Sequence, residues 1–190
     1  MKQKFIDKPV PDGVLNQIIE SATWAPSAHN SQPWSFVIIR DKSTKRKLAE
    51  NMAVVWGRDL QLESKSENEH TTQTSSSIER ISNAPVVLVV CLRTEHLRQY
   101  IGGRKYQCEH TMAIQSVAAA IQNLLLAAHA LNIGSCWMCA PLFCQETVRE
   151  TLGIPEHVEP QALVLLGYFE GSIEPPLRRQ LSKVIHMDGW

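Results

Sequence analysis

The sequence predicts a single domain in which helices and a sheet pack in two or three layers. Its 190 residues are enough to bury one substantial core. Hydrophobic residues make up 44% of the chain and charged residues 20%, as in ordinary globular proteins. Short apolar segments of strand length alternate with longer segments that have helical periodicity, and such elements pack as layers.

Four apolar segments are expected to be strands. Residues 85–92 form a continuous apolar run that begins with a proline, which is typical of a strand buried on both faces. The other three runs are shorter, and Gly, Pro or polar residues bound them. These expected strands are residues 34–40, 134–139 and 162–168.

Four helices are expected from apolar periodicity and from end signals. Ser43 is expected to cap the second of them, and Gly153 with Pro155 to end the fourth. The expected helices are residues 11–24, a segment from Ser43 through Met52, residues 110–132 and residues 145–152.

The third of these helices lies within the longest apolar run, residues 112–133. Polar residues interrupt it at a spacing of seven, as in Gln115 with Gln122 and Ser116 with Asn123, which places them along one face. Such residues would be costly in lipid, so we expect a fully buried core helix rather than a membrane span. The polar stripe is consistent with satisfied core groups, or with a face that meets a twofold partner or a ligand.

Two segments fall outside this pattern of elements. Residues 62–77 are polar and of low complexity, so they are expected to form a mobile lid or a solvated connecting loop. Residues 175–190 follow two consecutive prolines and contain three basic residues, which predicts a C-terminal basic arm on a single domain of residues 1–190.

Charge and cysteine content exclude several classes of protein. Nineteen acidic and nineteen basic residues cancel, so neither nucleic-acid nor membrane binding is expected. The first residues lack the apolar run of a signal peptide. Five cysteines, an odd number, do not suit a secreted disulfide scaffold and predict reduced thiols in the cytoplasm.

The strongest functional signal is a polar loop before the first expected strand. Pro26 and Pro33 fix the backbone on either side of it. Between the two prolines lie five side chains that form hydrogen bonds: Ser27, His29, Asn30, Ser31 and Gln32. This loop is predicted to hold a polar ligand against the fold.

With its flanking residues, the loop reads Pro-Ser-x-x-Asn-x-Gln-Pro-Trp-x-Phe and resembles the flavin-contacting loop of the nitroreductase family. Four later segments resemble the core helix, the segment beside the flavin, the closing unit and the C-terminal tail of that family. They are residues 119–128, residues 131–139, residues 148–155 with 162–168, and residues 176–181. Residues 56–60 and 134–137 are most similar to a nitroreductase-like module linked to the biosynthesis of a deazaflavin coenzyme.

The resemblance implies a nitroreductase-like α+β fold, with a mixed and mainly antiparallel sheet flanked by helices. It also implies an intertwined homodimer with FMN bound at the interface. By a ping-pong mechanism, NADH or NADPH would reduce the flavin, and a flat, electron-poor acceptor would then reoxidise it. Such acceptors are nitroaromatics, quinones and enones.

The resemblance also implies roles for individual residues. The FMN phosphate would be held by Lys2, Lys4, Ser27, Arg178 and Arg179. Asn30 and Gln32 would bind the polar edge of the ring, while Trp137 and the backbone of Cys139 and Ala140 would lie near its reactive atom N5. His29 and Arg58 are the expected substrate residues. No catalytic side chain is expected, because the flavin carries the chemistry.

Family members usually have an Arg-Ser-x-Arg element where this chain has Lys2-Gln3-Lys4. Lysine lacks the bidentate fork of arginine, so weaker FMN retention is expected. Two alternatives within the family are a reductase of a deazaflavin-coenzyme precursor and a branch that destroys flavin to make a cobalamin base, although no motif here selects the latter. Two others are a non-catalytic flavin-binding protein and, last, a thiol or zinc protein built on Cys136 and Cys139. A zinc site would need a second cysteine pair at suitable spacing, so buried structural cysteines and no metal are expected.

Overall fold

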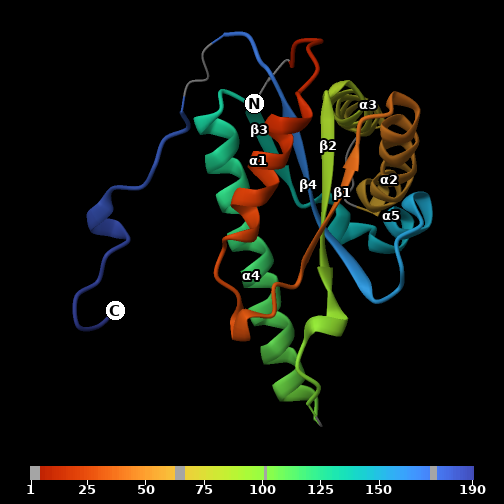
Figure 1. Ribbon diagram of the computed structural model, residues 1–190. Coiled ribbons are helices and arrows are strands. Elements are labelled where there is room, and N and C mark those ends of the chain that lie inside the picture. The colour runs from red at the N-terminus through yellow and green to blue at the C-terminus, as the bar shows by residue number, and fades with distance from the viewer. Residues whose placement is uncertain (1–4, 63–66, 101, 172–174) are drawn as a thin grey trace.

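The computed structural model describes residues 5–62, 67–100, 102–171 and 175–190 (Figure 1). Its helices and strands make an α+β fold, as predicted. The helices are α1 (Asp12–Thr23), α2 (Lys42–Leu62), α3 (Glu67–Asn83), α4 (Gly103–Ala130) and α5 (Gln145–Leu152). The strands are β1 (Trp34–Ile39), β2 (Val86–Arg93), β3 (Gly134–Met138) and β4 (Val158–Gly167).

The four strands form one sheet in the order β1-β2-β4-β3, and all three pairings between them are antiparallel. β2 and β4 lie at the centre and are buried along almost their whole length. Their apolar residues therefore face both sides of the sheet, as the continuous apolar run of β2 predicts.

Helices cover both faces of the sheet, which gives three layers (Figure 1). On one face, α1 and α4 pack over residues such as Leu88 and Val164. On the other, α2, α3 and α5 pack over Val87 and Leu165. Alternate residues of each central strand thus contribute to two separate cores.

α4 is longer than expected, beginning at Gly103, and it is not fully buried within one chain. Of its polar stripe, Gln115 and Gln122 are exposed, whereas Ser116 and Asn123 bond to the chain around α1. The sequence could not show that only one face of this helix meets the sheet. In the described part of the chain, α4 also has the length and hydropathy of a membrane span, a property shared by core helices of soluble proteins.

The polar segment 62–77 is not a loop where the structure describes it. Leu62 ends α2, and α3 already begins at Glu67. The C-terminal part of α3 is anchored by Ile78 and Ile81, which pack into the core beneath α2. This anchor lets the polar first half continue as a helix, a tertiary effect that composition does not reveal.

Asp41, rather than Ser43, provides the side chain that caps α2. Its Oδ2 atom accepts hydrogen bonds from the backbone N–H of Thr44, at 2.7 Å, and from the hydroxyls of Ser43 and Thr44. These bonds, that of the Ser43 hydroxyl first, lower the pKa of Asp41 from 3.8 to about 2.

The cap predicts an acid-dependent contribution to stability. A lowered pKa stabilises the folded state fully above pH ~4, and this contribution is lost as the pH falls toward ~2. Asp41→Ala should therefore unfold at a lower temperature than the wild type at pH 7. This difference in unfolding temperature should become smaller between pH 4 and 2. Thermal unfolding followed by circular dichroism checks this, with Asp188→Ala in the exposed arm as the control. A difference in unfolding temperature that does not change with pH would contradict the role of Asp41 as the cap of α2.

Residues 175–190 extend away from the layered body (Figure 1). The arm contains one short 3-10 turn, Leu181–Lys183, and its side chains are exposed. Several of them are apolar: Leu177, Leu181, Val184, Ile185, Met187 and Trp190.

Candidate functional site

The polar loop between α1 and β1, residues 26–33, has an unusual backbone. His29, Asn30 and Gln32 have left-handed φ angles of 58°, 53° and 45°. This region disfavours residues other than glycine, at roughly 1–3 kcal/mol each. Such strain persists only where the surroundings impose it, and it gathers at functional sites.

Hydrogen bonds within the loop and to α4 hold this conformation. The Ser27 hydroxyl accepts the N–H of Gln32 at 3.0 Å, closing the loop on itself. The Ser116 hydroxyl, from the buried side of α4, accepts the N–H of Ala28 at 3.2 Å. The loop is therefore fixed by its own serine and by a helix far away in the sequence.

The loop presents its amide side chains to solvent. Asn30 and Gln32 are exposed, and the Gln32 Nε2 atom donates to the Asn30 Oδ1 atom at 3.4 Å. Their other donor and acceptor positions face outward and suit a ligand with a polar, planar edge. Ser27, Asn30 and Gln32, three predicted cofactor residues, thus lie together in one rigid loop.

A second group of predicted residues lies at the opposite edge of the sheet from β1, the strand that follows the polar loop. β3 is an edge strand, on which Trp137 is exposed, and Cys139 and Ala140 follow it directly. A 3-10 turn, Ala140–Phe143, then leads into α5 and exposes Phe143. In one chain these residues and the polar loop occupy separate places.

Of the three cysteines near β3, Cys144 is buried, Cys136 is partly buried and Cys139 is exposed. Cys136, Cys139 and Cys144 are free, and burial raises the pKa of Cys136 and Cys144. A raised pKa disfavours the thiolate that redox and zinc chemistry require. Among the described residues, no group of three or more His, Cys, Asp or Glu could hold a metal ion.

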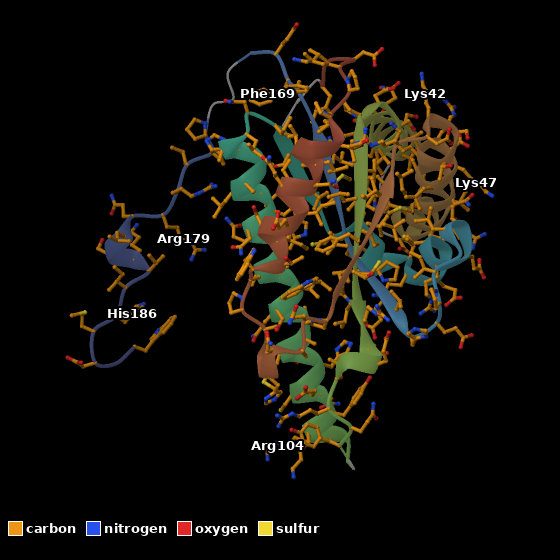
Figure 2. All side chains as sticks on the ribbon, viewed as in Figure 1. Lys42, Lys47, Arg104, Phe169, Arg179 and His186 are labelled. Carbon is orange, nitrogen blue, oxygen red and sulfur yellow. The ribbon has the colours of Figure 1, made fainter. Side chains whose placement is uncertain are left out.

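The two arginines predicted to bind the phosphate lie on the C-terminal arm rather than at the loop. Lys2 and Lys4 lie outside the described residues. Arg178 and Arg179 are exposed in the arm, and Figure 2 shows Arg179 well away from the body of the protein.

Arg58, a predicted substrate residue, lies on the opposite face of the sheet from α4. It lines a groove of about 400 Å³ between α2 and α5. Lys47 and Glu150 also line this groove, and the 26–33 loop does not. Only His29 among the predicted substrate residues therefore lies at the loop.

One residue at the loop was not predicted from the sequence. Glu109, on α4, is buried with a side chain only 2% exposed, and its Oε2 atom lies 3.6 Å from His29 Nε2. The available signal was its helical spacing, because Glu109 stands one turn before Ala113 and two turns before Ser116 on the buried face. A charged residue at a core position of an apolar helix is unusual.

The hydrogen-bonding groups of the loop and the cations of the arm match the chemistry of FMN. Asn30 and Gln32 offer the amide groups that a flavin ring edge requires, and the arm carries the two arginines that suit a phosphate. One chain holds these parts at separate positions, so a complete site needs them to be brought together.

Comparison with known proteins places this fold in a family. The sequence model of the Nitroreductase family matches residues 1–168. A protein of Archaeoglobus fulgidus with the provisional name NADH dehydrogenase/NAD(P)H nitroreductase is 32% identical over 86% of this chain and 77% of its own length.

Solved structures share this fold. A nitroreductase family protein from Streptococcus pneumoniae superposes with a TM-score of 0.74 at 24% identity, covering 97% of this chain and 94% of that one. A nitroreductase from Desulfovibrio desulfuricans, solved in complex with FMN, gives a TM-score of 0.71 at 22% identity, covering 99% and 91%. The chain belongs to the nitroreductase family.

Proposed function

We propose that this protein is an FMN-dependent oxidoreductase that takes hydride from NADH or NADPH. The observation that carries the proposal is the strained 26–33 loop, which presents Asn30 and Gln32 outward. Family membership supports it, as do the name of the Archaeoglobus relative and the FMN bound in the Desulfovibrio structure.

Bound FMN would supply a centre that accepts and gives up hydride. Asn30 and Gln32 hydrogen-bond the polar edge of its ring, while Ser27 keeps the loop closed through the N–H of Gln32. The backbone at Cys139 and Ala140, with Trp137, would line the ring near its reactive atom. These residues orient the reaction, and none of them exchanges electrons.

The phosphate is held by the arginines of the arm. Arg178 and Arg179 can form bidentate, charge-assisted hydrogen bonds with it. Lys2 and Lys4 are the additional candidates from the sequence. Because this chain has Lys2 and Lys4 where family members usually have arginines, Arg178 and Arg179 would be the main phosphate contacts.

The working unit is an intertwined homodimer. In one chain the arm extends away from the body and exposes apolar side chains such as Leu177 and Leu181. On α4, Leu126 is 59% exposed although it is a large aliphatic residue. A second copy would cover these surfaces and bring the arm, the loop and β3 into one site.

The acceptor is a flat, electron-poor molecule such as a quinone, a nitroaromatic or an enone, which is reduced after the nicotinamide has left. His29 and Trp137 are exposed next to the expected ring positions and would line this slot. A cytoplasmic location stays a prediction, in keeping with five free cysteines.

The test is an anaerobic titration. Protein saturated with FMN and passed through gel filtration should stay yellow and should bleach with NADPH or NADH. An Asn30→Ala/Gln32→Ala variant should elute with much less FMN, while keeping the unfolding temperature of the wild type to within a few degrees. Yellow protein that neither nicotinamide bleaches would favour a non-catalytic flavin-binding protein, and colourless wild-type protein would overturn the proposal.

A further inference from the structure

A buried carboxylate beneath the 26–33 loop has no part in the function proposed so far. One oxygen of Glu109, Oε1, accepts the backbone N–H of Arg98 at 3.3 Å. The other, Oε2, has no hydrogen-bond partner among the described residues. Burying a charge without full hydrogen bonding is costly, so this arrangement needs a compensating partner.

His29 is that partner. Its Nε2 atom lies 3.6 Å from the Oε2 atom of Glu109, which is too long for a hydrogen bond but suits an ion pair. The His29 side chain is 34% exposed, so the imidazole bridges the buried carboxylate and the outer surface of the loop. The left-handed backbone of His29, at φ 58°, holds the ring in this place.

The neighbouring histidine on α4 is engaged elsewhere. His110, the next residue on α4, pairs with Glu159 on β4 at 2.9 Å. Arg98 contributes its backbone N–H to Glu109. Among the described residues, the His29 imidazole is the one side chain paired with Glu109.

We propose that Glu109 is a positioning residue that orients the His29 imidazole, so that His29 donates a proton to the acceptor. This inference rests on the proposed function. It assigns a role to a helix residue about eighty positions away from the loop that it serves.

The reaction consumes a proton, and His29 is placed to deliver it. Reduction of a quinone to a hydroquinone consumes one hydride and one proton, and in the proposed function the hydride comes ultimately from the nicotinamide. The His29 ring N–H bond breaks and a new O–H bond forms at a quinone oxygen. The imidazole then regains a proton from water through its exposed side.

The geometry matches the way in which carboxylates assist histidines in other enzymes. A buried carboxylate facing one ring nitrogen fixes the orientation of the ring and of its other nitrogen. Because Nε2 faces Glu109, Nδ1 is the nitrogen left for the acceptor. A positioned proton donor contributes roughly 10²–10⁴-fold to a rate.

Stopped-flow reoxidation of the FMN-loaded, pre-reduced protein tests the inference with two oxidants. Benzoquinone needs a proton, whereas ferricyanide takes single electrons and no proton. The ratio of the benzoquinone rate to the ferricyanide rate should fall about 100-fold in His29→Ala and about 10-fold in Glu109→Gln. Added imidazole should restore the ratio in His29→Ala, which a merely structural role of His29 would not allow.

A second readout uses the cofactor-free protein. In nitrogen-15 NMR spectra, Glu109→Gln should move the ring-nitrogen signals of His29 and leave those of His186, in the arm, in place. Glu109→Met, which removes the buried carboxylate at similar volume, serves as a second variant if Glu109→Gln does not fold.

The outcomes separate the two proposals. If wild-type protein binds FMN and bleaches, but the oxidant ratio is unchanged in both variants, the proton-donor inference is wrong and the proposed function stands. If the His29 signals do not respond to either Glu109 variant, the positioning role is wrong. Wild-type protein that fails to bleach would overturn the proposed function, and the proton-donor role with it.

Discussion

FMN should bind at least ~100-fold more weakly to an Arg178→Ala/Arg179→Ala variant than to the wild type. Each charge-assisted hydrogen bond is worth roughly 1.5–3 kcal/mol, so the loss of two corresponds to about 3 kcal/mol or more. The effect should be large because Lys2 and Lys4, the other expected cations, lack the bidentate fork of arginine. Quenching of FMN fluorescence on titration with protein measures the dissociation constant.

Lys183→Ala is the matched control, because it removes a cation from the same exposed arm outside the expected phosphate contacts. Its affinity for FMN should stay within about threefold of the wild type, since an exposed charge contributes little. Sedimentation should show whether the double variant keeps the oligomeric state of the wild type. A double variant that binds FMN as tightly as the wild type would assign the phosphate to other residues.

Leu124→Ala should lower the free energy of unfolding by about 3 kcal/mol, within the range of 2–5 kcal/mol for such changes. Leu124 is fully buried on the face of α4 that packs against α1 and the sheet. For a chain of this size, the loss corresponds to a melting temperature lower by roughly 6–12 °C. Urea unfolding followed by circular dichroism measures it.

Leu126→Ala provides a control on the same helix. In a single chain Leu126 is largely exposed, so its replacement should change stability by less than about 0.5 kcal/mol. In a homodimer that covers this face, the same variant should instead weaken association, and its effect should grow on dilution. Equal losses for Leu124→Ala and Leu126→Ala at high dilution would contradict the one-sided burial of α4.

The sequence predicted the parts of the fold whose signals are local. β2 follows from its apolar run, and α5 from its glycine stop, where Gly153 adopts a left-handed φ of 66°. α3 was missed because the contacts that make its polar half helical are with α2, and composition does not contain them. The cap of α2 was placed two residues late, since Asp41 and Ser43 are both good capping residues.

The same distinction holds for the candidate site. Ser27, Asn30 and Gln32 were predicted together because they are neighbours in the chain. Glu109 and Ser116 were not assigned to the loop, because they reach it only when α4 packs beside it. Arg58 was placed by resemblance alone, and its position on the far face of the sheet depends on how α2 lies.

The strand order has a consequence for how the protein is made. The two central strands, β2 and β4, are neighbours in the sheet, but α4, β3 and α5 are synthesised between them. Contacts so distant in sequence form slowly, because a long loop must close before any of them stabilises the chain. On the ribosome, β2 would therefore remain an apolar strand with one unpaired edge until β4 emerges. Chaperones are expected to bind the nascent chain during this interval.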